Sequence, residues 1–280
     1  MCRFDYLLIH PISTMNTNAK PSPVPNWAKF AVASSVCFGV NPQNADAEQL
    51  VFLDATGLDE GPLEAWRNFG STEGDFVSAG DTVPEVTTVN GVRTVSLIGG
   101  TGGAAGTHYV GPIAPESVTD SGTSRTIEAW IYNPDSQAEE TIFSWSRRGG
   151  PDGTNVSFNH GTNGTFGALG QWGADADVGW NGEIVFNAWT FIAYTYDADT
   201  TTTRVFKDGA LVNEEQHGLS LLPFDEDTAG NPIPFRIGRQ INNDGTLSDV
   251  GVGAVHIARL RVHDEALDED TLSGTFEEEK

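Results

Sequence analysis

Cysteine is almost absent from this chain of 280 residues. The two cysteines that occur, Cys2 and Cys37, both lie in the first 40 residues. If that segment is removed, the remaining chain has no thiol and cannot form a disulfide. Its stability must then come from a hydrophobic core, which a domain of this length can bury.

Basic side chains are also scarce. Lysine and arginine together number 15, against 39 aspartates and glutamates, which gives a formal net charge of −24. A surface of that charge repels nucleic acid and anionic membranes, so we expect neither as a partner. The charge is typical of a plain solvated acidic surface. It also suits a protein that stays soluble outside a cell or that binds divalent cations.

The apolar run near the N-terminus, residues 30–40, is too short to span a bilayer as a stable helix. It follows a Pro-rich stretch flanked by Lys20 and Lys29, and it precedes Ala45-Asp-Ala47, which has small residues where a signal peptidase reads them. We therefore predict that residues 1–47 are a cleaved secretory signal and that the protein is secreted or extracytoplasmic. Residues 48–280 are then a single domain that does not span a membrane. The alternative is a disordered tail with a chance apolar run.

Helical periodicity is missing before the C-terminal end, while glycine (32) and proline (14) are plentiful. This composition favours short strands joined by turns. Residues 189–196 form an aromatic and β-branched run, and residues 203–206 return in the opposite direction. Asp208 and Gly209, which tolerate positive φ, then predict a hairpin turn.

Two further segments have a clear period. Residues 125–132 place Ile127, Ala129 and Ile131 on one strand face, with polar and aromatic residues on the other. Residues 265–272, which follow Asp264, predict a short helical turn that closes the domain. Together the patterns predict an all-β domain.

Four motifs, in order, resemble one family. They are 126–132 (TIEAWIY), 188–197 followed by 204–209 (AWTFIAYTYD and RVFKDG), 235–239 (FRIGR) and 253–267 (GAVHIARLRVHDEAL). These segments are similar to motifs of laminin-G-like domains in the concanavalin A-like lectin/glucanase superfamily, over roughly residues 48–275. The resemblance implies a two-sheet antiparallel β-sandwich, a jelly roll, and a lectin-like function.

The same superfamily includes glucanases, so catalysis needs a separate argument. The glucanase relatives carry two carboxylates on one strand as E-x-D-x-x-E or E-x-D-x-E, and this chain has neither string. Glu128 stands alone in its predicted strand. We therefore predict a binding protein rather than an enzyme and assign no catalytic residue. A polysaccharide-degrading glycosidase or lyase with a discontinuous carboxylate pair stays as the alternative.

One acidic loop is a candidate for calcium. Asn242, Asp244 and Asp249 lie in a Gly-containing loop whose oxygens suit Ca²⁺. In pentraxin relatives the loop after the corresponding I-G strand supplies calcium ligands, but the spacing here differs from theirs and from that of an EF-hand. The alternative is a turn whose Asn and Asp residues favour positive φ. The only cofactor that the sequence suggests is therefore Ca²⁺.

A second loop, residues 170–182, is a candidate for sugar. A pyranose has an apolar face and a polar rim, so it needs a flat aromatic ring with amide and carboxylate partners. The loop offers such groups in Trp172, Trp180, Asp175, Asp177 and Asn181. The alternative is that both tryptophans cap the core, as large aromatics usually do. Trp130, Trp145 and Trp189 lie on predicted strands and are stronger core candidates.

These observations predict a secreted laminin-G-like domain that binds glycan, with calcium assistance as an option. The expected partner is a glycan or polysaccharide, or an extracellular protein. Two alternatives remain open at this point: the polysaccharide-degrading enzyme, and an extracellular adhesion or structural module that binds only protein.

Overall fold

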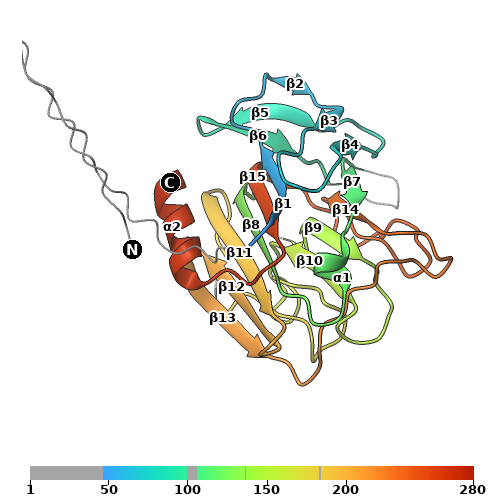
Figure 1. Ribbon diagram of the computed structural model, residues 1–280. Helices are drawn as coiled ribbons and strands as arrows, with labels where there is room; N and C mark the ends of the chain where they lie inside the picture. Colours follow the sequence, from blue (N-terminus) through green and yellow to red (C-terminus); the bar gives the residue numbers. More distant parts are fainter. Residues whose placement is uncertain (1–46, 100–105, 136, 183) are drawn as a thin grey trace, which may run out of the picture. The chain divides into compact units, whose positions relative to one another are not determined.

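The computed structural model describes residues 47–99, 106–135, 137–182 and 184–280 (Figure 1). Its described residues form two antiparallel sheets and two helices. The predicted all-β sandwich of the jelly-roll type is therefore confirmed. The predicted secretory signal and both cysteines lie outside the described residues, apart from Ala47.

The larger sheet has nine strands, in the order β13-β12-β11-β8-β15-β6-β5-β2, with β1 paired to β15. Its strands are β1 (Gln49–Asp54), β2 (Gly61–Pro62), β5 (Glu85–Val89), β6 (Val92–Ser96), β8 (Arg125–Tyr132), β11 (Trp189–Asp197), β12 (Thr202–Lys207), β13 (Ala210–Gln216) and β15 (His256–His263).

The smaller sheet has six strands, in the order β10-β9-β14-β7-β4-β3. Its strands are β3 (Ala65–Trp66), β4 (Phe76–Ser78), β7 (Tyr109–Ile113), β9 (Thr141–Ser146), β10 (Asn155–Asn159) and β14 (Pro234–Ile237).

The hydrophobic core lies between the two sheets. Alternation in β8 places Ile127, Ala129 and Ile131 in this core, as the sequence predicts. The six-stranded sheet contributes Phe158, whose ring lies 6.0 Å from that of Tyr194 on β11. Trp145 on β9 is fully buried, so its prediction as a core residue is confirmed.

The strands predicted at residues 189–196 and 203–206 are β11 and β12, and they pair antiparallel, with Ile192 opposite Lys207 and Asp197 opposite Thr202. The turn after β12 contains Asp208 at φ 51° and Gly209 at φ 78°, as predicted. A Cβ atom on Gly209 would lie 2.9 Å from Ser273 Cα, so glycine is required here both by φ and by the close approach of α2.

The closing helix begins later than predicted. Instead of residues 265–272, α2 spans Glu269–Glu279, and Asp268 is its N-cap: its side chain accepts a hydrogen bond from the Thr271 amide at 2.8 Å. The sequence analysis placed the start at Asp264, but Asp264 Oδ1 accepts the backbone amide of Glu48, and Asp268 takes the N-cap position. The other helix, α1 (Glu116–Thr119), is a single turn.

Helix α2 packs on the outer face of the nine-stranded sheet (Figure 1). Its Leu272 is buried in a second apolar cluster with Phe191, Ala193 and Phe206 of the sheet. Trp130 and Trp189 also belong to this side of the sheet and are only partly buried, so neither lies in the core between the sheets. No helix among the described residues is long and apolar enough to cross a membrane.

Candidate functional site

The outer face of the six-stranded sheet is polar. On β10, Val156 and Phe158 point into the core, and Asn155, Ser157 and Asn159 point away from it. The amide of Asn155 donates to Gly170 O at 2.8 Å, and that of Asn159 donates to Phe166 O at 3.1 Å. These side chains therefore hold the loop after β10 against the sheet.

Residues 166–172 form an irregular segment. Leu169 makes isolated bridges to Phe158 and Val178, and the rest of the segment follows β10 without forming a named strand. Its last residue, Trp172, has φ 67°, and the following Gly173 has φ 100°. Positive φ is unusual for a bulky residue and costs conformational energy, which is typical of functional sites.

A cavity of about 370 Å³ lies beside the Trp172 indole. We call it the Trp172 cavity; its main side chains are Trp172, Asp177, Glu139, Arg148, Asn155 and Gln240. The indole is partly buried, and the Arg148 guanidinium carbon lies 5.7 Å from the centre of its ring. An aromatic ring thus stands next to amide, carboxylate and guanidinium groups in one cavity.

Gln240 is the centre of the polar network in the cavity and is only 1% exposed. Its Nε2 donates to Glu139 Oε1 at 2.7 Å and to Thr141 Oγ1 at 2.8 Å. Its Oε1 accepts from Arg148 Nη1 at 3.1 Å and from Asn155 Nδ2 at 3.3 Å. Arg148 Nη1 also pairs with Glu139 Oε1 at 2.8 Å. This network fixes the polar side chains before any ligand arrives, which lowers the entropic cost of binding.

Asp177 has a different environment from Glu139. Asp177 Oδ1 accepts a hydrogen bond from the backbone N–H of Gln171 at 2.7 Å. Among the described residues, Asp177 has no ion pair. Burial is the main cause that raises the pKa of Asp177 from 3.8 to about 6; the Glu139 charge adds to the rise, while the Gln171 and Trp172 amides and Arg148 oppose it. Near neutral pH this side chain can therefore exchange a proton.

The other predicted sugar-binding residues are not in this cavity. Trp180 is 8% exposed, packs against Phe158 and His160, and donates from Nε1 to Gly167 O at 3.1 Å. Asp175 and Asn181 are exposed and do not line the Trp172 cavity. Of the five residues predicted from the loop, the structure thus brings together Trp172 and Asp177.

Three cavity residues that the sequence analysis missed come from distant loops: Glu139, Arg148 and Gln240. No local motif marks them. The parallel bridge between Arg148 and Asn242 brings the Arg148 loop and the Gln240 loop together. Gln240 directly follows the FRIGR motif. This position just after a predicted strand was the one feature of the sequence that could have pointed to Gln240 as a site residue.

The predicted calcium residues lie in a loop in which Asp244 Oδ1 and Asn242 Nδ2 already have hydrogen-bond partners. Asp244 Oδ1 accepts from Thr246 N at 3.1 Å and from Thr246 Oγ1 at 2.6 Å, and these bonds lower the pKa of Asp244. Asn242 Nδ2 donates to Leu247 O at 3.2 Å. Asp249 is exposed, and its charge raises the pKa of Arg239 against the effect of burial.

No group of three or more His, Cys, Asp or Glu side chains suited to a metal ion occurs within the described ranges. Asp227 and Asp244 interact electrostatically. The charge of Asp227 acts to raise the pKa of Asp244, but the hydrogen bonds from Thr246 have the larger effect and the pKa is lowered overall. Calcium binding by Asn242, Asp244 and Asp249 stays a prediction.

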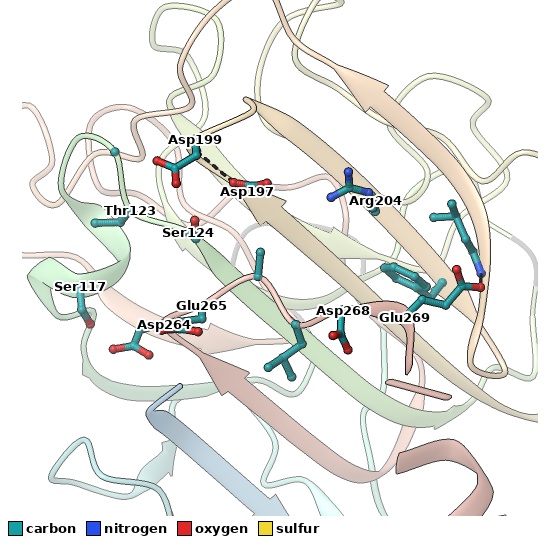
Figure 2. A pocket seen from close by; sticks show the side chains of 15 residues that line it. Ser117, Thr123, Ser124, Asp197, Asp199, Arg204, Asp264, Glu265, Asp268 and Glu269 are labelled. Carbon is teal, nitrogen blue, oxygen red and sulfur yellow. Dashed lines mark hydrogen bonds between the residues drawn. The ribbon is translucent and has the colours of Figure 1, made fainter. Parts of the chain in front are cut away.

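A larger cleft, of about 810 Å³, lies between α1, β12 and the start of α2 (Figure 2). Its acidic side chains are Asp197, Asp199, Asp264, Glu265, Asp268 and Glu269. Several of them accept backbone amides: Asp268 caps α2, and Asp264 Oδ1 accepts the Glu48 amide at 2.8 Å. Because these carboxylates have structural roles, the Trp172 cavity is the better candidate site.

Comparison with known proteins gives one family. The family model Laminin_G_3, described as the concanavalin A-like lectin/glucanases superfamily, matches residues 103–273. A search of curated proteins finds no match.

Solved structures share the architecture at low identity. A mutant of Trypanosoma rangeli sialidase with trans-sialidase activity has 14% identity and a TM-score of 0.50, covering 82% of this chain and 32% of that chain. Domain 4 of AbnA, an extracellular arabinanase from Geobacillus stearothermophilus in complex with arabinotriose, has 13% identity and a TM-score of 0.49, covering 81% and 98%.

The binding domain of botulinum neurotoxin DC, in complex with rat synaptotagmin II, has 11% identity and a TM-score of 0.49, covering 82% of this chain and 51% of that chain. This chain thus spans about half of the neurotoxin domain and about a third of the sialidase. At such identities the sialidase likeness shows the fold alone.

Proposed function

Since the chain belongs to the concanavalin A-like lectin/glucanases superfamily, we propose that it binds carbohydrate and that the Trp172 cavity is its site. The observation that carries this proposal is a partly exposed indole beside a fixed network of amide and charged side chains. The indole offers an apolar surface to one face of a sugar ring, and the network offers hydrogen bonds to its hydroxyls.

The charges in the cavity favour a neutral sugar. Arg148 is already paired with Glu139, so Asp177 adds a negative charge above its pKa of about 6. A carboxylated sugar such as a uronic or sialic acid would therefore be repelled at neutral pH. We expect neutral oligosaccharides to bind more tightly than uronic acid oligomers of the same length.

Replacement of Trp172 by Ala tests the proposal. Loss of the ring should weaken binding of neutral oligosaccharides about tenfold or more, because aromatic stacking contributes about 0.5–1.5 kcal/mol beyond area burial. Isothermal titration with cellohexaose, xylohexaose, mannohexaose and arabinohexaose measures the effect. Phe69→Ala is the matched control, since Phe69 is 56% exposed and lies outside the Trp172 cavity. Equal affinity of Trp172→Ala and the parent chain would show that the Trp172 cavity is not the binding site.

Calcium and secretion belong to the same proposal. The acidic charge and the predicted leader favour a protein that works outside the cytoplasm. Titration in calcium and again in EDTA tests whether the Asn242, Asp244 and Asp249 loop assists binding. Affinity that falls in EDTA, and that no longer falls in Asp244→Asn, would support calcium at this loop. The same affinity in both buffers would remove calcium from the proposal.

One observation favours hydrolysis as a second candidate function. Glu139 and Asp177 line the same cavity in unlike environments, and glycoside hydrolysis uses one protonated and one ionised carboxyl group. Such a pair is discontinuous in sequence and would escape the motif argument. Release of reducing ends from the same oligosaccharides, together with its loss in Glu139→Gln, would support the glycosidase hypothesis over binding alone.

A further inference from the structure

A second groove, of about 250 Å³, lies on the outer face of the nine-stranded sheet, away from the Trp172 cavity. We call it the hairpin groove. Trp130, Trp189, Val92, Ala258, Arg259 and Glu279 contribute to its lining, which is mostly apolar. None of these residues lines the Trp172 cavity, so a substitution in one site removes no lining residue of the other.

One wall of the hairpin groove comes from the β5–β6 hairpin. Its tip is a tight turn with Asn90 at φ 49° and Gly91 at φ 84°. Val89 O at this tip accepts a hydrogen bond from Trp189 Nε1 at 3.1 Å. In the sheet, β8 and β15 lie between β6 and β11, so the hairpin tip must reach across the outer face to make this bond. The bond fixes the Trp189 indole.

Another part of the lining comes from the end of α2, through Glu279. Phe276 stacks on Trp130 with ring centres 5.7 Å apart and an interplanar angle of 25°. Glu279 Oε2 accepts the Trp130 indole N–H at 2.8 Å. The helix therefore covers Trp130, while the partly buried Trp189 contacts the Tyr132 ring, with ring centres 5.9 Å apart.

The floor of the groove is a β-bulge. The pairing of β15 with β8 shifts between Ile257 and Arg259, which makes Ala258 the extra residue. Ala258 O accepts the Ala55 amide at 2.8 Å, so the bulge is held from outside the β8–β15 ladder. Bulges often occur next to binding sites, where they redirect side chains. A small residue at the bulge leaves room above it.

Charged side chains stand at the rim. Arg259 Nε pairs with Asp54 Oδ2 at 3.3 Å, and Arg259 Nη1 pairs with Glu279 Oε1 at 3.1 Å. The Arg259 side chain is still 28% exposed. Glu279 also pairs with Arg261, so both of its oxygens already have partners, and the partly exposed Arg259 guanidinium is the polar group beside the indoles.

We propose that the hairpin groove binds a single neutral pyranose unit, as a second saccharide subsite. The ring of such a sugar presents C–H groups to the Trp189 indole and hydroxyls to Arg259. The groove volume is below the range of about 300–1,000 Å³ that drug-sized ligands occupy, which fits one ring rather than a long chain.

The test uses the 280-residue chain and the variants Trp189→Ala, Trp189→Phe and Phe69→Ala. Each is titrated with cellohexaose, xylohexaose and mannohexaose, in the parent chain and in a Trp172→Ala background. In the Trp172→Ala background we expect Trp189→Ala to weaken binding of at least one hexasaccharide about tenfold, and Trp189→Phe to stay within about threefold of that background, because it keeps a ring face. Phe69→Ala should leave every affinity unchanged.

The thermal midpoint of each variant shows whether it is folded, and Trp189→Phe separates loss of the bond to Val89 O from loss of the ring. N-acetyl-tryptophanamide is titrated in parallel. If this compound binds the groove and no hexasaccharide depends on Trp189, the occupant is an aromatic side chain and the proposal is overturned. Unchanged affinities when Trp189→Ala is added to folded Trp172→Ala, or no binding of any hexasaccharide by the parent, would also overturn it. Complete loss of hexasaccharide binding in folded Trp172→Ala would overturn it as well, because the hairpin groove is intact in that variant.

Discussion

The outer faces of the two sheets are covered in different ways. On the nine-stranded sheet, Phe191, Ala193 and Phe206 lie under Leu272 of α2, and beside this apolar cluster Arg261 pairs with Glu128 and with Glu279 of the helix. On the six-stranded sheet, the outward residues of β10 are Asn155 and its polar neighbours, and loops cover the face through hydrogen bonds.

This difference separates stability from binding. An apolar face must be covered, because exposed apolar surface is costly in water. A polar face can keep a hydrated cavity at little cost, since each side chain bonds water when no ligand is present. The Trp172 cavity lies on the polar face. The hairpin groove lies where the cover of the apolar face ends.

The largest expected effect concerns Trp180, the apolar anchor of the loop that carries Trp172. Trp180→Ala should lower the free energy of unfolding by about 3–5 kcal/mol, because it removes a buried ring packed on Phe158. Urea denaturation measures the change. Trp172→Ala, eight positions earlier in the same loop, should lose less than about 1 kcal/mol. Equal losses would show that both rings have the same structural role.

Leu272→Ala tests the apolar face. Leu272 is fully buried between α2 and the sheet, so its truncation should cost about 2–4 kcal/mol of unfolding free energy. Oligosaccharide affinity at the Trp172 cavity should not change, because that cavity lies on the other sheet. A large loss of affinity without unfolding would break the separation between the two faces.

Gln240→Leu tests the polar face. The change leaves Glu139, Arg148 and Asn155 each without one hydrogen-bond partner and should cost about 1–3 kcal/mol of unfolding free energy. Gln216→Leu is the matched control on exposed strand β13, where we expect a change within about 0.5 kcal/mol. If the two variants are equally stable, the network around Gln240 does not contribute to folding.

Asp177→Asn should have the smallest effect, and one that depends on pH. The carboxyl group ionises near 3.8 when unfolded and near pH 6 when folded, so the folded state binds the extra proton between these values. Stability due to this group is therefore lost as pH rises from 3.8 to 6. With allowance for solvent in the cavity, the variant should gain about 1 kcal/mol at pH 7 and nothing near pH 4. A gain of equal size at both pH values would contradict this account.

Local patterns predicted much of the fold. The alternation of Ile127, Ala129 and Ile131 placed β8 correctly because a two-residue period depends only on neighbouring residues. Asp208 and Gly209 gave the hairpin turn for the same reason. The helix start was misplaced by four residues because Asp264 and Asp268 both resemble N-caps, and the contact that engages Asp264, with the amide of Glu48, joins residues far apart in the sequence.

The candidate site was less accessible to sequence reasoning. Trp172 and Asp177 were found because one loop carries both. Glu139 and Gln240 were missed, since tertiary folding brings them together from about a hundred positions apart. Trp180 has the same local surroundings of glycine and aspartate as Trp172, but packing against Phe158 and His160 buries it, and nothing in the loop itself encodes that contact.

The central claim, that the Trp172 cavity holds a neutral sugar, is tested most directly by a crystal structure of the chain soaked with the tightest-binding hexasaccharide. The account predicts a sugar ring against the Trp172 indole, with hydroxyls within hydrogen-bond distance of at least one of Glu139, Arg148 and Asp177. Sugar bound elsewhere, with the Trp172 cavity holding only solvent, would contradict it.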